Sequence, residues 1–239
     1  MAKGLTPLMD AARRGNVEAA KAALGGASRK ALVGRESEFE IALRFAVHSG
    51  NLALVRLLVK NKARVECGAD SILKAPAVAG NEGMVRFLIE HGAHASTPHE
   101  RLLMECCKAG RKAVAQLLVQ HGADPNYRDG MLLVEAAEDG DARAMQILID
   151  CGGDPNGARW ELILMRAISG DCAETVRVLA EAGVDLIEHG AEALKVARRW
   201  CAEGAEQVIR EQQSAQGEAL RHHFARQLAP QGAGAVAWY

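Results

Sequence analysis

The stretch that decides the fold is residues 97–126, which reads TPHERLLMECCKAGRKAVAQLLVQHGADPN. Two apolar segments with helical spacing flank Gly110, and the stretch ends in the polar segment 121–126. Glycine can end a helix because it readily adopts the left-handed conformation. Comparable glycines recur every 30 residues, at positions 50, 80, 110, 140 and 170. The sequence therefore predicts a series of helix–turn–helix repeats.

The residue after each glycine is expected to start the second helix of its repeat. Asn and Asp suit this position because their side-chain oxygens accept a hydrogen bond from a backbone N–H in the first helical turn. The residues found there are Asn16, Asn51, Asn81, Arg111, Asp141 and Asp171. Apolar stripes follow, such as Met84, Val85, Phe87 and Leu88, and they are typical of a helix with one buried face.

Seven repeats fit this pattern between residues 1 and 213. Their approximate bounds are 4–36, 37–68, 69–98, 99–128, 129–158, 159–188 and 189–213. The seventh repeat carries Trp200 in place of the glycine. Residues 214–239 are expected to form a C-terminal capping helix and an apolar tail, because a stack of repeats needs its open end covered. We expect the tail, 232–239, either to fold back on this cap or to contact a partner.

The first helices have start signals of their own. Thr97-Pro98-His99-Glu100 is typical of a capping box with Pro at the first helical position, and Asp70 and Asp129 are predicted to be N-caps. Pro76 falls inside a first helix and should bend or shorten it. The long connection 25–40 is interpreted either as an extra solvated turn or as a loop that contacts a partner.

Two motifs resemble those of a known family. Thr6-Pro7-Leu8-Met9-Asp10-Ala11-Ala12-Arg13-Arg14-Gly15-Asn16 resembles the ankyrin opening T-P-L-H-x-A-A-x-x-G-H/N, and HGADPN at 121–126 resembles the ankyrin close. The resemblance covers about residues 4–212. It implies an all-α fold, an ankyrin-like helix-turn-helix solenoid with a C-terminal capping helix. Ankyrin repeats are typically 33 residues long, so the 30-residue spacing predicts shortened β-hairpin loops and binding on the concave surface of the first helices.

The composition and motifs exclude several classes of protein. The formal net charge of −1 argues against a nucleic-acid-binding protein, which usually needs a basic face. No phosphate-binding loop, zinc-protease, serine-hydrolase or kinase motif occurs, so we expect no enzymatic activity, no cofactor and no metal. Neither a signal peptide nor a membrane span is recognisable, which predicts a cytoplasmic protein. We expect it to be a monomer on its own.

The cysteines and histidines are expected to have structural roles. None of the six cysteines pairs with another at C-x-x-C spacing. Cys106 and Cys107 stand where other repeats have Ala, so the cysteines are expected to be small buried residues. His91 and His121 lie near predicted helix ends, where hydrogen bonding to the backbone is the expected role.

The resemblance also implies a binding surface, because the fifth, eighth and ninth residues of the opening motif line the concave face of ankyrin repeats. The candidate contact residues are Arg13, Arg14, Phe45, His48, Val78, Glu105, Lys108, Glu135, Glu138, Asp139, Met165, Ile168, Arg198 and Arg199. These positions are basic at both ends, apolar at Phe45, Val78, Met165 and Ile168, and acidic in the fifth repeat. Apolar anchors within a charged rim are typical of protein interfaces. Packing between adjacent first helices is the alternative explanation of the apolar residues.

We therefore expect a non-enzymatic module that binds a folded protein partner on its concave face, with the acidic residues of the fifth repeat meeting a basic patch. A more specific hypothesis is an inhibitor or immunity-type protein, because the Ala-, Gly- and Arg-rich composition looks bacterial. One alternative is binding of nucleic acid or a phosphorylated ligand by the basic ends, Arg13-Arg14 and residues 195–200. Enzymatic activity is the least favoured alternative.

Overall fold

The computed structural model describes residues 6–25, 36–61, 63–65, 72–93, 99–184 and 190–228. Within these ranges every regular element is a helix and none is a strand, which confirms the predicted all-α fold with shortened loops. The chain divides into two compact units. The first unit comprises residues 1–128 and 146–153, and the second comprises residues 129–145 and 154–239.

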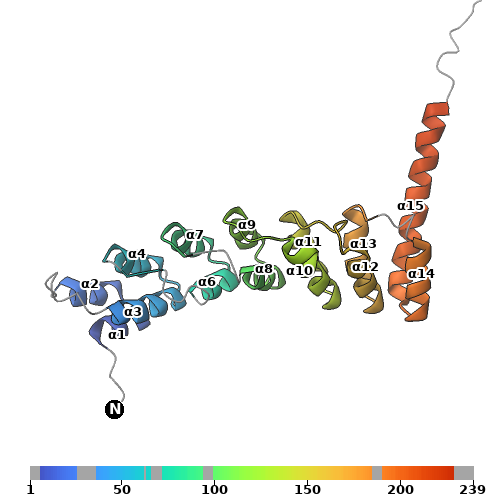
Figure 1. Ribbon diagram of the computed structural model, residues 1–239. Helices are drawn as coiled ribbons and strands as arrows, with labels where there is room; N and C mark the ends of the chain where they lie inside the picture. Colours follow the sequence, from blue (N-terminus) through green and yellow to red (C-terminus); the bar gives the residue numbers. More distant parts are fainter. Residues whose placement is uncertain are drawn as a thin grey trace, which may run out of the picture. The chain divides into compact units, whose positions relative to one another are not determined.

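Helix pairs build the first unit. Its helices are α1 (Pro7–Arg13), α2 (Val17–Gly25), α3 (Glu36–His48), α4 (Leu52–Lys60), α6 (Lys74–Ala79), α7 (Glu82–Glu90), α8 (His99–Lys108) and α9 (Lys112–Gln120). The first helices α1, α3, α6 and α8 form one layer, and the second helices α2, α4, α7 and α9 form the other (Figure 1). Each first helix packs against the next, so that α3 contacts both α1 and α6.

The remaining helices are α10 (Tyr127–Glu138), α11 (Ala142–Asp150), α12 (Trp160–Ser169), α13 (Ala173–Glu181), α14 (Gly190–Arg199) and α15 (Glu203–Leu228). In the second unit α12 contacts α13 and α14, and α15 contacts α13 and α14. The predicted second helix of the seventh repeat and the predicted C-terminal helix are one continuous helix, α15, as Figure 1 shows.

Small side chains line the contacts between neighbouring first helices. Cys106 and Cys107 are fully buried, as are Ala136 and Ala137 at the equivalent positions of the next repeat. Small residues let two helix backbones approach closely, and a free cysteine packs as a small apolar residue. The prediction for this pair of cysteines is confirmed. It is wrong for Cys201, whose side chain is exposed, and for Cys151 and Cys172, which are only half-buried.

Most predicted N-caps of the second helices are confirmed. The side-chain oxygens of Asn16, Asn51, Asn81 and Asp141 accept hydrogen bonds of 2.9 to 3.1 Å from the backbone N–H three residues later. Asn51 also donates from Nδ2 to the carbonyl oxygen of Gly15 at 2.9 Å. Arg111 makes no such cap, and its Nε donates instead to the carbonyl oxygen of Val78 at 3.0 Å. Asn51 thus ties its turn to the turn of the preceding repeat, and Arg111 ties its turn to the end of α6.

The turn of the sixth repeat differs from the prediction. Gly170 has a φ of −85°, and Asp171 takes the left-handed conformation with a φ of +49°. Cys172, not Asp171, is the N-cap residue of α13. The turn has the same length and the same backbone hydrogen bonds as the turn at Gly140, whose φ is +65°, with Asp171 in the place of Gly140. The extra residue of the sixth repeat therefore lies earlier, in the segment that leads into α12. The seventh repeat has the same turn, with Cys201 in the left-handed conformation at a φ of +53°.

Two other predicted features of the first helices have different outcomes. Asp129 is not an N-cap, because it lies inside α10 with a φ of +59°. Pro76 lies in α6, which spans 6 residues against 13 in α3, so the predicted shortening is confirmed. Asp70, Thr97 and Pro98, residues 26–35 of the long connection and the tail 232–239 lie outside the described residues.

Candidate partner-binding surface

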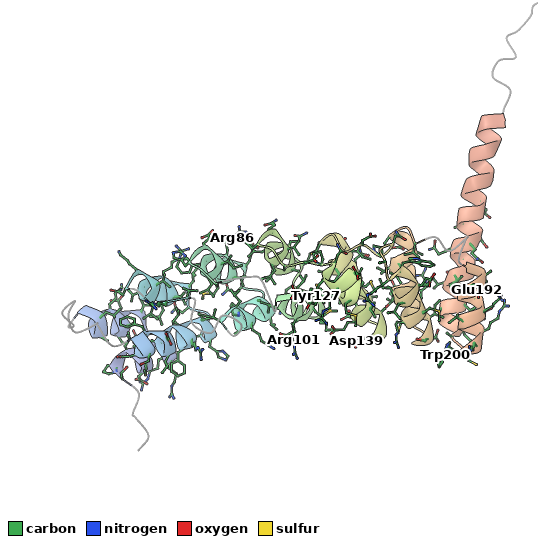
Figure 2. All side chains as sticks on the ribbon, viewed as in Figure 1. Arg86, Arg101, Tyr127, Asp139, Glu192 and Trp200 are labelled. Atoms are coloured by element: carbon green, nitrogen blue, oxygen red, sulfur yellow. The ribbon has the colours of Figure 1, made fainter. Side chains whose placement is uncertain are left out.

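The candidate residues of the first unit all lie on its layer of first helices. Arg13 and Arg14 lie at the end of α1, Phe45 and His48 on α3, Val78 on α6, and Glu105 and Lys108 on α8. Figure 2 shows the side chain of Arg101 on this layer, whereas Arg86 points outward from the layer of second helices. Phe45, Val78 and Glu105 are half-buried, and the other candidates of this unit are exposed.

A groove of about 700 Å³ lies between α3 and α6. Its residues are Arg44, Val47, His48, Ile72, Lys74, Ala75, Val78 and Ala79. Val47 and Ile72 are each only 4% exposed and form its floor. The candidates His48 and Val78 are therefore brought together on the two walls of one groove.

The groove exists mainly because α6 carries a small side chain at one position where its neighbours carry large ones. Ala75 stands at the repeat position of Phe45 in α3 and of Glu105 in α8. Ala79 stands at the position of Ser49, immediately after α3. The short α6, limited by Pro76, adds to the space because it covers less of the neighbouring helix than a helix of full length.

Basic side chains form the rim of the groove. Lys74 Nζ lies 2.6 Å from Glu105 Oε1 and therefore forms an ion pair with this residue of α8. The side chains of Arg44 and His48 make no ion pair or hydrogen bond within the ranges that the structure describes. Residues 41 and 44 are one helical turn apart, and Ile41 is 41% exposed. One edge of the groove thus offers both positive charge and apolar surface.

The predicted acidic patch of the fifth repeat is partly neutralised within the second unit. Glu138 Oε1 lies 3.0 Å from Arg166 Nε of α12. The neighbouring candidates Glu135 and Asp139 have interactions of their own, so none of the three acidic side chains is without a partner. This patch has less charge to offer a binding partner than the sequence predicts.

Some of the basic candidate residues at the two ends of the repeats also form ion pairs within the protein. Arg198 Nε donates to Glu206 Oε1 at 3.0 Å, and Arg210 contacts the same oxygen at 2.6 Å. The hydrogen bond from Arg198 and the charge of both guanidinium groups lower the pKa of Glu206 below its ordinary value. Arg14 is similarly paired with Asp10 at 3.0 Å. Arg199 remains exposed at the end of α14.

The placement of Ile168 on the binding surface is wrong. Ile168 is fully buried, because an extra residue in the segment that leads into α12 moves the register of that helix by one. Ile168 therefore occupies the position of the buried Ala137, and Arg166 occupies that of Glu135. Met165 is 42% exposed and remains accessible. It borders a smaller groove of about 320 Å³ between α12 and α14, whose floor includes Ile168.

Three exposed apolar residues were not predicted from the sequence. Ile41 and Met131 are each 41% exposed, and Trp200 is 59% exposed. Ile41 and Met131 precede Phe45 and Glu135 by four residues, so they lie on the same helix faces one turn earlier. This four-residue spacing could have identified both residues from the sequence. Trp200 lies in the turn after α14, at the end of the helix shown in Figure 2.

No chemical centre accompanies this surface in the described ranges. They contain no group of three or more His, Cys, Asp or Glu side chains that could hold a metal ion. Burial, and to a lesser degree the neighbouring charge of Glu105, raises the pKa of the Cys106 thiol to about 12. Among the helices described, none is sufficiently long and apolar to span a lipid bilayer.

Two family models and one of the solved structures below agree with the helix-pair architecture. Residues 43–129 match the family model "Ankyrin repeats (3 copies)", and residues 3–32 match "Ankyrin repeat". The human ASB11 ankyrin repeat domain is 22% identical, with 87% of this chain and 97% of that chain covered and a TM-score of 0.60. An ankyrin repeat domain from Acinetobacter baumannii AYE is 21% identical over 86% of this chain and 97% of that chain, with a TM-score of 0.37. No curated protein matched the sequence.

Proposed function

We propose, from the premise that this chain belongs to the ankyrin-repeat family, that it binds a folded protein partner through the face of its first helices. Ankyrin repeats are generally protein–protein interaction modules. The observation that carries the proposal for this chain is the groove between α3 and α6. It lies on the face that is concave in the family.

The chemistry of the first helices supports this proposal. Interfaces depend on a few apolar anchors, surrounded by polar groups that exclude water and select the partner. The first helices carry exposed or half-buried apolar side chains at Ile41, Phe45, Met131 and Met165. Charged residues flank each of them, among them Arg44 and Arg166. A helix face that only meets water has no need of apolar residues at these positions.

The proposed module acts by covering a surface of its partner and not by catalysis. An inhibitor or immunity-type protein works in this way, since covering the functional surface of an enzyme or toxin is sufficient to block it. The buried free thiols Cys106 and Cys107 suit a reducing compartment, and we therefore place the module in the cytoplasm. Nucleic-acid binding is a weaker candidate because Arg14 and Arg198 are already paired with carboxylates.

The test compares two double variants of the full chain. Phe45→Ala with Met165→Ala truncates half-buried or exposed residues of the first helices. Val59→Ala with Ile149→Ala truncates half-buried residues of second helices and is the matched control. Each tagged protein is used to capture partners from its native source, and the affinity for the captured protein is then measured by calorimetry.

We expect one stoichiometric partner that binds the wild type and the control with similar affinity and the first-helix variant at least about tenfold more weakly. Thermal unfolding of each variant shows that the loss is not a loss of fold. Equal affinity for both variants would place the binding site elsewhere. Capture of no stoichiometric partner would contradict the proposed function itself.

A further inference from the structure

We infer that the groove between α3 and α6 binds a peptide segment of the partner protein in which an apolar side chain lies next to acidic residues. This inference rests on the proposed function and specifies the chemistry of the partner. It follows from the floor of the groove, from its shape and from the charge on its rim.

The floor of the groove requires an apolar occupant. Val47 and Ile72 are almost completely buried, and the half-buried Ala75 and Val78 form the wall on α6. Water against such a surface is displaced favourably by an apolar side chain. The truncated side chain of Ala75 leaves the space that Phe45 fills at the same position of the preceding repeat. An aliphatic or aromatic side chain of the partner would therefore occupy this space.

The shape of the groove favours a peptide over a small molecule. Its lining comes from α3, from α6 and from Ile72 just before α6, so it has two walls. Sites for small molecules bury roughly 70–90% of the ligand surface, which a trough between two neighbouring helices does not achieve. A segment of polypeptide needs to bury only the side chains that face the trough, and it continues beyond both ends.

The rim determines the charge of the occupant. The lining residues include Arg44, His48 and Lys74 but no Asp or Glu. Lys74 is paired with Glu105, whereas Arg44 and His48 have no side-chain partner within the described residues. A guanidinium group binds a carboxylate through two parallel hydrogen bonds, so Arg44 selects an acidic residue. A basic segment would be repelled at the same place.

The spacing on α3 indicates where the carboxylates lie in the segment. Arg44 and His48 are four residues apart on one helix face, which places their Cβ atoms about 5–6 Å apart. Side chains two residues apart in an extended peptide point the same way and are separated by about 6.6 Å. We therefore expect acidic residues at positions i and i+2 of the segment, with the apolar anchor within the same few residues.

The experiment selects binders from a phage-displayed library of random 12-residue peptides on the immobilised full chain. The affinity of the most enriched peptides is then measured by fluorescence anisotropy with synthetic, labelled copies. Two variants alter the groove: Arg44→Glu reverses the charge of the rim, and Ala75→Phe fills the space with the residue that the preceding repeat carries at this position. Lys60→Glu on α4 and Ala19→Phe on α2 make the same chemical changes on exposed positions of second helices.

We expect enriched peptides with an apolar residue beside at least two acidic residues. Their affinity should fall at least about tenfold with Arg44→Glu and with Ala75→Phe, and should change less than about twofold with the two controls. Arg44 is an exposed surface residue, so its variant keeps the test valid even if Ala75→Phe disturbs the fold. Enrichment of basic or uncharged peptides, equal affinity for the groove variants, or no enrichment at all would overturn the inference.

The failure of this inference is distinguishable from failure of the proposed function. If the peptides fail while the Phe45→Ala, Met165→Ala variant still loses the captured partner, the first helices bind the partner outside this groove. If both experiments fail, the proposed function falls as well.

Discussion

The carboxylate of Asp171 caps a helix that begins in the next repeat. Its Oδ1 accepts a hydrogen bond of 3.0 Å from the backbone N–H of Ala205, the third residue of α15. A Cβ at position 204 would lie 3.2 Å from the same oxygen, so Gly204 leaves room for this approach. The first N–H groups of a helix have no partner within the helix. The start of α15 therefore depends on a turn that lies 34 residues earlier.

Replacing Asp171 should loosen α15 through this single contact. We expect Asp171→Ala to lower the free energy of unfolding by about 1–2 kcal/mol, because it removes a helix cap and places Ala at a positive φ. Asp171→Asn keeps an acceptor and tolerates the left-handed conformation, so its stability should stay close to that of the wild type. Urea denaturation of both variants measures the difference. Equal stability of the Ala and Asn variants would show that the cap contributes nothing.

Removing a left-handed glycine from one turn should lower stability, whereas introducing one at the equivalent position of another turn should raise it. Gly140 has a φ of +65°, and a Cβ added there would lie 2.5 Å from Cys172 Sγ. Gly140→Ala should therefore be destabilising by more than the roughly 1–2 kcal/mol that a left-handed L residue costs. Cys201→Gly should instead stabilise the protein by about 0.5–1 kcal/mol, because Cys201 already has a φ of +53°. Thermal unfolding of the two variants tests this, and a fall in Tm for Cys201→Gly would contradict it.

The ion pair between Lys112 and Asp150 should make stability depend on pH. Lys112 Nζ donates to Asp150 Oδ2 at 2.6 Å, which joins α9 to α11. This hydrogen bond is the main reason why the pKa of Asp150 lies below its ordinary value of 3.8. A lowered pKa means that the unfolded chain takes up the proton first as the pH falls. The contribution of Asp150 is therefore present above about pH 4 and is lost as the pH falls through the lowered folded-state pKa.

Lys112→Met removes the donor and should reduce this dependence. We expect the wild type to exceed the variant in stability at pH 6 and the difference to shrink at pH 2.5, as measured by urea denaturation at both values. Lys21→Met removes an exposed lysine from the ion pair with Glu18 on α2 and serves as the control. A difference between wild type and Lys112→Met that stays the same at both pH values would mean that Lys112 acts through packing of its aliphatic chain.

The cysteines should differ strongly in their reaction with alkylating reagents. Cys201 is exposed, whereas Cys106 is buried and its thiol has a pKa raised to about 12. Alkylation requires the thiolate, which is scarce at pH 8 when the pKa is this high. We expect iodoacetamide at pH 8 to modify Cys201 within minutes and Cys106 only after unfolding. Mass spectrometry of proteolytic peptides reads out both sites, and early modification of Cys106 would show that its helix opens readily.

Much of the fold was predictable because short sequence motifs within each repeat indicate where its helices begin. Asn51 and Asn81 follow left-handed glycines and cap the next helix, and both parts of that signal lie within a few residues. The sixth repeat was mispredicted because Gly170 was taken as the turn residue. The apolar stripe of its second helix begins 31 residues after that of the fifth, from Met145 to Val176, and this spacing was visible in the sequence. Because of this one extra residue, Ile168 lies in the core and not on the predicted surface.

The candidate binding surface was less predictable than the fold. The sequence indicated an apolar region from Phe45 to Val78, and the groove of about 700 Å³ lies there. Its depth depends on what surrounds Ala75 in three dimensions, which position in a repeat does not reveal. The ion pair between Glu138 and Arg166 was hidden for a similar reason, since the two residues are 28 positions apart and come together only when α12 packs.

Hydrogen bonds between neighbouring repeats also couple their stabilities. Asn51 bonds to the carbonyl oxygen of Gly15, and Arg111 bonds to that of Val78 at the end of α6. When one repeat unfolds, such groups of its neighbour lose their partners. Damage to one repeat should therefore weaken the repeats beside it first, because each repeat of a stack contacts only its neighbours.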